Sequence, residues 1–196
     1  MLSQNILVRT GNILSLNEAK TKASQNPTDE FSMYHNHSNH NSRVCNSLNI
    51  NAIESLVIAY LSKENPEELL ASLKHLWIAV EEYVKIGKLS SVGLSDVDTN
   101  VFIDLFQWAN IKPNIVQISL ATCCVVPPAL QTFSKENDIQ LLTHNDPGQI
   151  LPEEDLNGIF NANTNLYWVT RYQIHLKCRG ILSSKGYLVY VSKKTK

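Results

Sequence analysis

Long apolar runs are absent from this chain of 196 residues. No stretch approaches the roughly 20 consecutive apolar residues that a membrane-spanning helix requires. Residues 1–14 also lack the charged start and the unbroken apolar core of a secretory leader. We therefore expect a protein that neither enters a membrane nor is exported.

Cysteine is also scarce. The spacing of Cys45, Cys123, Cys124 and Cys178 matches no small secreted disulfide scaffold. A chain of this length with 43% hydrophobic residues can bury a sizeable core without disulfide bonds. The composition therefore predicts a reducing, cytoplasmic environment.

Acidic residues are missing from the C-terminal part of the chain. Residues 167–196 contain seven basic residues, whereas all 18 acidic residues lie before them. The formal net charge of −1 therefore conceals a basic end on an acidic body. The lysines of this end accompany no DNA- or RNA-binding motif, so a nucleic-acid partner is not expected.

Residues 1–54 carry little apolar pattern apart from a short segment at residues 5–9. A run rich in His, Asn and Ser covers residues 35–42 and includes His35, His37 and His40. Such a run buries too little apolar area to offset the entropy lost on ordering, so residues 1–54 are predicted to be weakly ordered. The three histidines could hold a transition metal, but a solvated polar loop is the preferred interpretation.

Short apolar runs alternate with helical patterns from residue 55 to residue 143. In the first helical pattern Asn65 is the predicted N-cap, Pro66 the first helical residue and Gly87 the stop. Asp98 is the predicted cap of the next helix. Strands are predicted at residues 55–61, 89–94, 115–120 and 139–142. Parallel strands with helical crossovers form either an open sheet or a section of a (β/α) barrel, and spacing alone does not choose between them.

Three blocks resemble consecutive helix-strand units of the aldo-keto reductases: residues 81–96, 108–120 and 133–148. This resemblance selects the barrel, so residues 55–196 are predicted to form a partial (β/α) TIM-type barrel with a basic C-terminal tail. A complete barrel takes about 250 residues and each βαβ unit about 30. Because residues 1–54 cannot supply the other units, the barrel is predicted to be incomplete at its N-terminal side.

A more specific resemblance is to the modifier, or regulatory, subunits of glutamate-cysteine ligase. It is carried by ATCCVVPPAL (residues 121–130), DIQLLTHNDP (138–147) and RGILSSKGYLV (179–189), and more weakly by residues 9–17. The resemblance implies a regulatory protein that is not itself an enzyme and has no cofactor or metal of its own. It implies a heterodimer with the ligase catalytic subunit in the cytoplasm, where the chain would modulate glutathione biosynthesis.

Reductase chemistry is the alternative on the same fold. Aldo-keto reductases use a Tyr, Lys, Asp and His set, and the position of that His is occupied here by Tyr60. A tyrosine with no visible lysine or carboxylate partner is a poor proton donor at neutral pH, and no glycine-rich phosphate-binding segment is present. An NADPH-binding protein with a residual oxidoreductase or sensing role stays as the second hypothesis.

Three cysteines are candidates for redox contact with a partner. Cys123 and Cys124 follow the third predicted strand, at the end where barrel proteins place functional loops. Either could form a mixed disulfide, or both could be small buried apolar side chains. Cys178 lies between Lys177 and Arg179, and cationic neighbours favour a thiolate.

Four further residues of the C-terminal part are candidates for partner contact: Trp168, Arg171, Arg179 and Lys185. Tryptophan and arginine are enriched among the anchors of protein interfaces, and the resemblance implies docking to an acidic protein surface.

His144, Asn145 and Asp146 end the fourth predicted strand. They could form an acid-base cluster, but a turn in which Asn145 and Asp146 bond their own backbone is preferred. Trp77 and Trp108 lie on helical apolar patterns and are predicted core residues.

Overall fold

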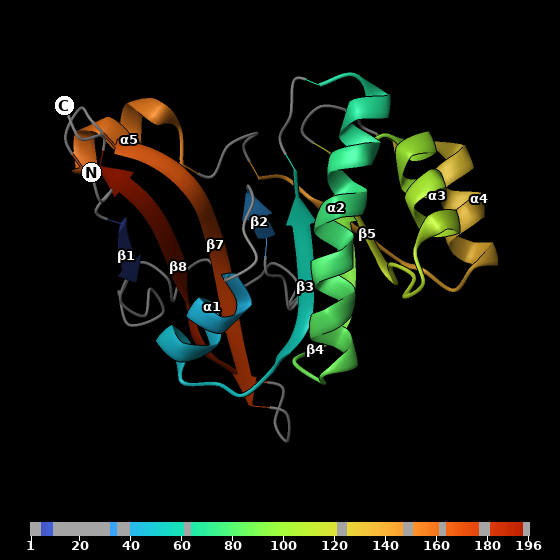
Figure 1. Cartoon of the computed structure of the whole chain (residues 1–196). Helices are drawn as coiled ribbons and strands as arrows, with labels where there is room; N and C mark the ends of the chain where they lie inside the picture. The colour runs from blue at the N-terminus through green and yellow to red at the C-terminus, as the bar shows by residue number, and fades with distance from the viewer. Residues whose placement is uncertain are drawn as a thin grey trace. The chain divides into compact units, whose positions relative to one another are not determined.

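A computed structural model describes residues 5–9, 32–34, 40–60, 64–120, 125–146, 151–160, 164–176 and 181–193. The chain divides into two compact units (Figure 1). Unit 1 combines residues 1–33 with residues 151–196, and unit 2 contains residues 34–150. The predicted boundary at residue 54 does not coincide with this division, since it falls inside unit 2.

Unit 2 contains four parallel strands that pair in chain order. They are β3 (Ile53–Ala59), β4 (Leu89–Ser95), β5 (Ile115–Ser119) and β6 (Gln140–His144). The connections are α2 (Pro66–Lys85), α3 (Thr99–Trp108) and α4 (Pro128–Glu136), and α3 packs against both other helices (Figure 1). The predicted succession of parallel βα units, a section of a (β/α) barrel, is confirmed.

Helices α2 and α3 begin where local sequence signals place them, and α2 also ends where the signal predicts. The Asn65 side chain accepts a hydrogen bond of 2.9 Å from the Glu68 N–H, and Pro66 is the first residue of α2. Gly87 follows the C-cap with φ of 71°, a conformation that glycine adopts without steric cost. The Asp98 carboxylate accepts from the Asn100 N–H at the start of α3. These predictions are confirmed.

The two tryptophans predicted for the core of unit 2 have different environments. Trp77 is fully buried, and its indole N–H donates to the Ile111 carbonyl at 2.8 Å. Trp108 is 41% exposed, so its prediction as a core residue was wrong. It is the last residue of α3, and the Lys74 ammonium lies 5.5 Å from the ring centroid.

A helix also replaces part of the predicted polar loop. The helix α1 (His40–Leu48) begins at His40, so the assignment of residues 40–42 to a loop was wrong. Val44 and Leu48, one turn apart, are both buried and give this short helix an apolar side. Residues 35–39, with His35 and His37, lie outside the described residues. In the described part of the chain, no helix is both long and apolar enough to cross a membrane.

Unit 1 is antiparallel. Its two long strands, β7 (Thr164–Leu176) and β8 (Ile181–Lys193), pair with each other. Strand β1 (Asn5–Arg9) pairs with β8, and β2 (Ser32–Tyr34) pairs with β7 through Ser32 and Met33. Helix α5 (Glu153–Phe160) packs on β7. Gly186 lies within β8, opposite Tyr172.

Candidate functional site

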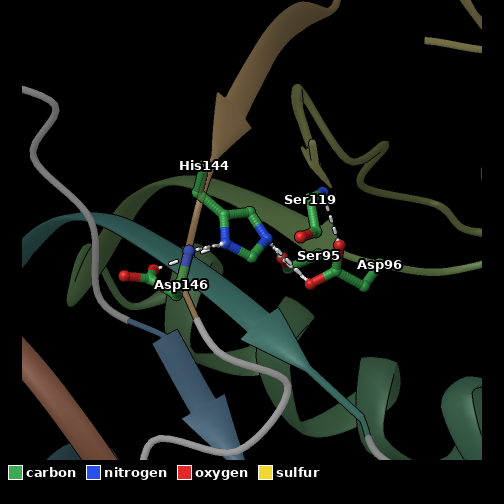
Figure 2. Close-up of polar contacts among 5 residues, drawn as sticks. All are labelled: Ser95, Asp96, Ser119, His144 and Asp146. Carbon is green, nitrogen blue, oxygen red and sulfur yellow. Dashed lines mark hydrogen bonds and ion pairs between the residues drawn. The ribbon is translucent and has the colours of Figure 1, made fainter. Parts of the chain in front are cut away.

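A polar cluster lies at the carboxyl ends of three neighbouring strands of unit 2. Because parallel strands end at the same edge of a sheet, the last residues of β4, β5 and β6 meet there. Figure 2 shows how the side chains point toward one another. The members of the cluster are Ser95, Asp96, Ser119, His144 and Asp146.

Asp96 holds β4 and β5 together at this edge. Its φ of 57° lies in the left-handed region, which is unfavourable for a residue with a side chain. Its N–H donates to the Gln117 carbonyl at 2.9 Å, and its carboxylate accepts from the Ser119 N–H at 2.7 Å and the Ser95 hydroxyl at 2.9 Å. Burial opposes ionisation, but these bonds and the one from His144 hold the pKa of Asp96 below its ordinary value.

His144 lies between two carboxylates. Its Nε2 is 2.9 Å from Asp96 Oδ2, its Nδ1 is 3.4 Å from Asp146 Oδ2, and the side chain is only 11% exposed. The hydrogen bond to Asp146 and then that to Asp96 outweigh burial and raise the pKa of His144 to about 9. The Asp146 N–H also approaches Nδ1, at 3.2 Å, and only a neutral ring could accept it. Two carboxylates outweigh one amide dipole, so the imidazolium form is favoured at neutral pH.

The protonation state limits the chemistry of this cluster. Ser95 Oγ lies 3.4 Å from His144 Nε2, as a serine nucleophile would from its base, but the hydroxyl donates to Asp96 instead. An imidazolium cannot accept the serine proton, so the pair is unsuited to nucleophilic catalysis near pH 7. Among the residues that the structure describes, no group of His, Cys, Asp and Glu side chains is arranged to hold a metal ion. The cluster is therefore an ion-pair network that ties three strand ends together.

This network makes stability depend on pH in a defined direction. Because the folded-state pKa of His144 is raised above 6.5, its contribution is fully present below pH 6.5 and is lost as the pH rises through about 9. After allowance for solvent screening we expect a loss of about 1–2 kcal/mol in the free energy of unfolding. Urea unfolding at pH 6 and pH 9.5 measures it. His144→Gln should remove this part of the pH dependence, and an unchanged dependence in that variant would contradict the assignment.

Sequence reasoning found only part of this cluster. It placed His144 and Asp146 at a strand end but preferred a turn, and it missed Ser95, Asp96 and Ser119. The missing signal was positional, since polar residues that end neighbouring parallel strands are brought together by the sheet. Tyr60 directly follows β3 at the same end of its strand, as predicted.

The structure describes only some of the residues that were predicted to contact a partner. Cys123, Cys124, Cys178 and Arg179 lie outside the described residues. Trp168 is 1% exposed and stacks on Tyr190 with ring centroids 5.3 Å apart, so it is a core residue and not an accessible anchor.

The structure does bring two of the predicted contact residues together. Arg171 lies opposite Tyr187, and Lys185 lies opposite Gln173, in the β7–β8 pairing. Since residues two apart along a strand point to the same side, Arg171 and Lys185 share one face of the hairpin. We call this pair the β7–β8 basic face. Both side chains are half-buried.

The parallel βα units of unit 2 define the class of its fold as a section of an α/β barrel. A crystal structure of an aldo/keto reductase from Brucella melitensis is similar over 60% of this chain and 44% of its own, with 18% identity and a TM-score of 0.42. No family profile matches the chain.

The chain is similar in sequence to glutamate-cysteine ligase regulatory subunits. Those of Rattus norvegicus and Homo sapiens are each 38% identical over 161 residues, which is 76% of this chain and 58% of theirs. A putative regulatory subunit of Schizosaccharomyces pombe is 27% identical over 133 residues, 64% of this chain and 46% of its own. The chain therefore spans about half the length of these relatives.

Proposed function

We propose that this chain is a regulatory subunit that binds the catalytic subunit of glutamate-cysteine ligase and modulates glutathione biosynthesis. The observation that carries the proposal is the 38% identity to regulatory subunits over 76% of the chain. The chemistry of the ligase then belongs to the partner. A histidine that keeps its proton at neutral pH cannot serve as the base for the neighbouring Ser95.

Modulation requires that the chain discriminates between states of its partner. A ligand shifts a conformational equilibrium only by the difference in its affinity for the two states. We infer that the chain binds more tightly to the catalytic subunit in the state with higher affinity for substrate. Binding would then lower the apparent KM of the ligase.

Co-purification with the catalytic subunit, followed by ligase assays at limiting glutamate, tests this proposal. We expect a complex whose apparent KM for glutamate is lower than that of the catalytic subunit alone. A chain that is folded by circular dichroism but forms no complex would contradict the proposal. A complex with unchanged kinetics would contradict the modulation alone.

The β7–β8 basic face is the first contact surface that we propose for this partner. Arg171 and Lys185 present two cations on one side of the hairpin, in a region without acidic residues. Reversing Lys185 to Glu should weaken the complex about tenfold and reduce its salt dependence, because a like charge would then face the acidic partner. Lys135→Glu, at an exposed lysine on α4, is the matched control and should leave the affinity unchanged. If both variants weakened the complex equally, the affinity would depend on the net charge of the chain and not on this face.

Cys123, Cys124 and Cys178 remain predicted sites for a mixed disulfide with the partner. Such a bond forms when a thiolate attacks a disulfide or sulfenic acid on the other chain, with a thiol or water as the leaving group. Peroxide treatment of the complex and a non-reducing gel test it. A covalent heterodimer that persists when all three residues are Ser would refute the assignment.

A further inference from the structure

Among the large apolar side chains that are exposed in unit 2, two lie within α2 and α3. Trp108 ends α3, and Ile78, which is 53% exposed, lies on α2. The Lys74 ammonium lies over the Trp108 ring, and Ile78 follows Lys74 by four residues, hence on the same side of α2. We call Lys74, Ile78 and Trp108 the α2–α3 patch.

The patch rests on a firmly anchored base. The chain directly after Trp108 is bound to α2 at two points: the Trp77 indole donates to the Ile111 carbonyl, and the Glu81 carboxylate accepts from the N–H groups of Asn110 and Ile111. All three contacts join α2 to the loop after α3. A surface held in one conformation loses less entropy when it binds.

The charge on the patch is available to a partner. The Lys74 ammonium forms no ion pair with any residue that the structure describes, and its contact is the Trp108 ring. A partly exposed tryptophan beside a cation has the composition of interface hot spots. An approaching apolar side chain would cover Trp108 and Ile78, while a carboxylate beside it would meet Lys74.

We propose that the α2–α3 patch is a second contact surface for the ligase catalytic subunit and takes an apolar side chain flanked by a carboxylate. This inference rests on the proposed function. A second copy of the chain fits the patch less well, because a two-fold contact centred there would bring the two Lys74 ammonium groups together. An acidic and apolar partner surface complements both the charge of Lys74 and the exposed side chains of Trp108 and Ile78.

Affinity for the purified catalytic subunit, measured by biolayer interferometry, tests the patch. Trp108→Ala and Lys74→Glu should each weaken binding about tenfold or more, because each removes a central contact. Ile86→Ala, at another exposed isoleucine just after α2, is the matched control and should bind as the wild type does. Asp104→Lys removes an exposed acid one turn before Trp108 and should bind as tightly or more tightly.

The outcomes separate the two proposals. If the wild type binds and the patch variants bind equally well, the patch is overturned while the regulatory function stands. If the folded wild type does not bind, both proposals fall. If sedimentation shows a wild-type dimer that Trp108→Ala dissociates, the patch is a self-association surface and the inference is overturned. Thermal melts of each variant exclude loss of folding as the cause.

Discussion

Gly93→Ala is expected to unfold unit 2. Gly93 lies in β4 and pairs with Ile115 of β5. A Cβ at this position would lie 2.1 Å from the Ile115 carbonyl oxygen and 2.5 Å from the Ile115 Cβ. The obstructing atoms belong to the backbone of the next strand, so relief requires β4 and β5 to separate. We expect a loss above about 4 kcal/mol, a large part of the stability of a typical domain.

Gly158→Ala is the matched control for this prediction. Gly158 lies in α5, and a Cβ there would meet no atom within 4 Å. Because alanine favours a helix over glycine, this change should stabilise by about 0.5–1 kcal/mol. Urea unfolding followed by circular dichroism measures both variants. A Gly93→Ala protein that melts within a few degrees of the wild type would show that β4 and β5 are not so closely apposed.

Glu81→Ala should cause the second-largest loss of stability. Glu81 is a buried carboxylate, with 4% of its surface exposed. Its Oε1 accepts from the Asn110 N–H at 2.7 Å and the Ile111 N–H at 3.1 Å, and its Oε2 accepts from Asn110 Nδ2 at 3.2 Å. Truncation leaves two backbone donors without their acceptor. We expect a loss of about 2–4 kcal/mol in the free energy of unfolding.

Acid should weaken the same hydrogen bonds, because it protonates the Glu81 carboxylate. Burial opposes ionisation of Glu81, but the bonds from Ile111 and Asn110 outweigh it and lower the pKa below the ordinary 4.5. A lowered folded-state pKa means that the contribution is present above pH 4.5 and is lost as the pH falls through the folded value. Glu81→Gln keeps an acceptor oxygen and should lose less stability than Glu81→Ala. Unfolding at pH 7 and pH 3 should show a smaller acid loss in Glu81→Gln than in the wild type.

Local signals predicted unit 2 well, because each acts over a few residues. Asn65 and Asp98 cap helices through bonds to donors two or three residues ahead, and Gly87 ends a helix through its own backbone freedom. The near-continuous apolar run of residues 55–61 predicted the strand that is observed as β3. The resemblance of residues 121–130, 138–147 and 179–189 to regulatory subunits was likewise visible in the sequence and agrees with the similarity found.

Unit 1 was predicted less well, because its pairing is long-range. The register of β1 on β8 joins Asn5 to Ser192, and no local pattern encodes such a partner. Trp168 lies in a basic, aromatic stretch that suggests an interface, yet cross-strand packing against Tyr190 buries it. Exposure of an aromatic side chain depends on what the rest of the chain places over it.

By itself the sequence determined where α2 and α3 begin, that the strands of unit 2 are parallel, and which proteins the chain resembles. Those properties follow from hydrophobic periodicity, capping and residue identity, which act locally. Only the tertiary structure decided that His144 lies against Asp96, 48 residues earlier, and that Trp108 is exposed. The physical reason is that the ends of neighbouring parallel strands meet regardless of their separation in sequence, so the protonation of His144 is set by groups that the sheet alone brings together.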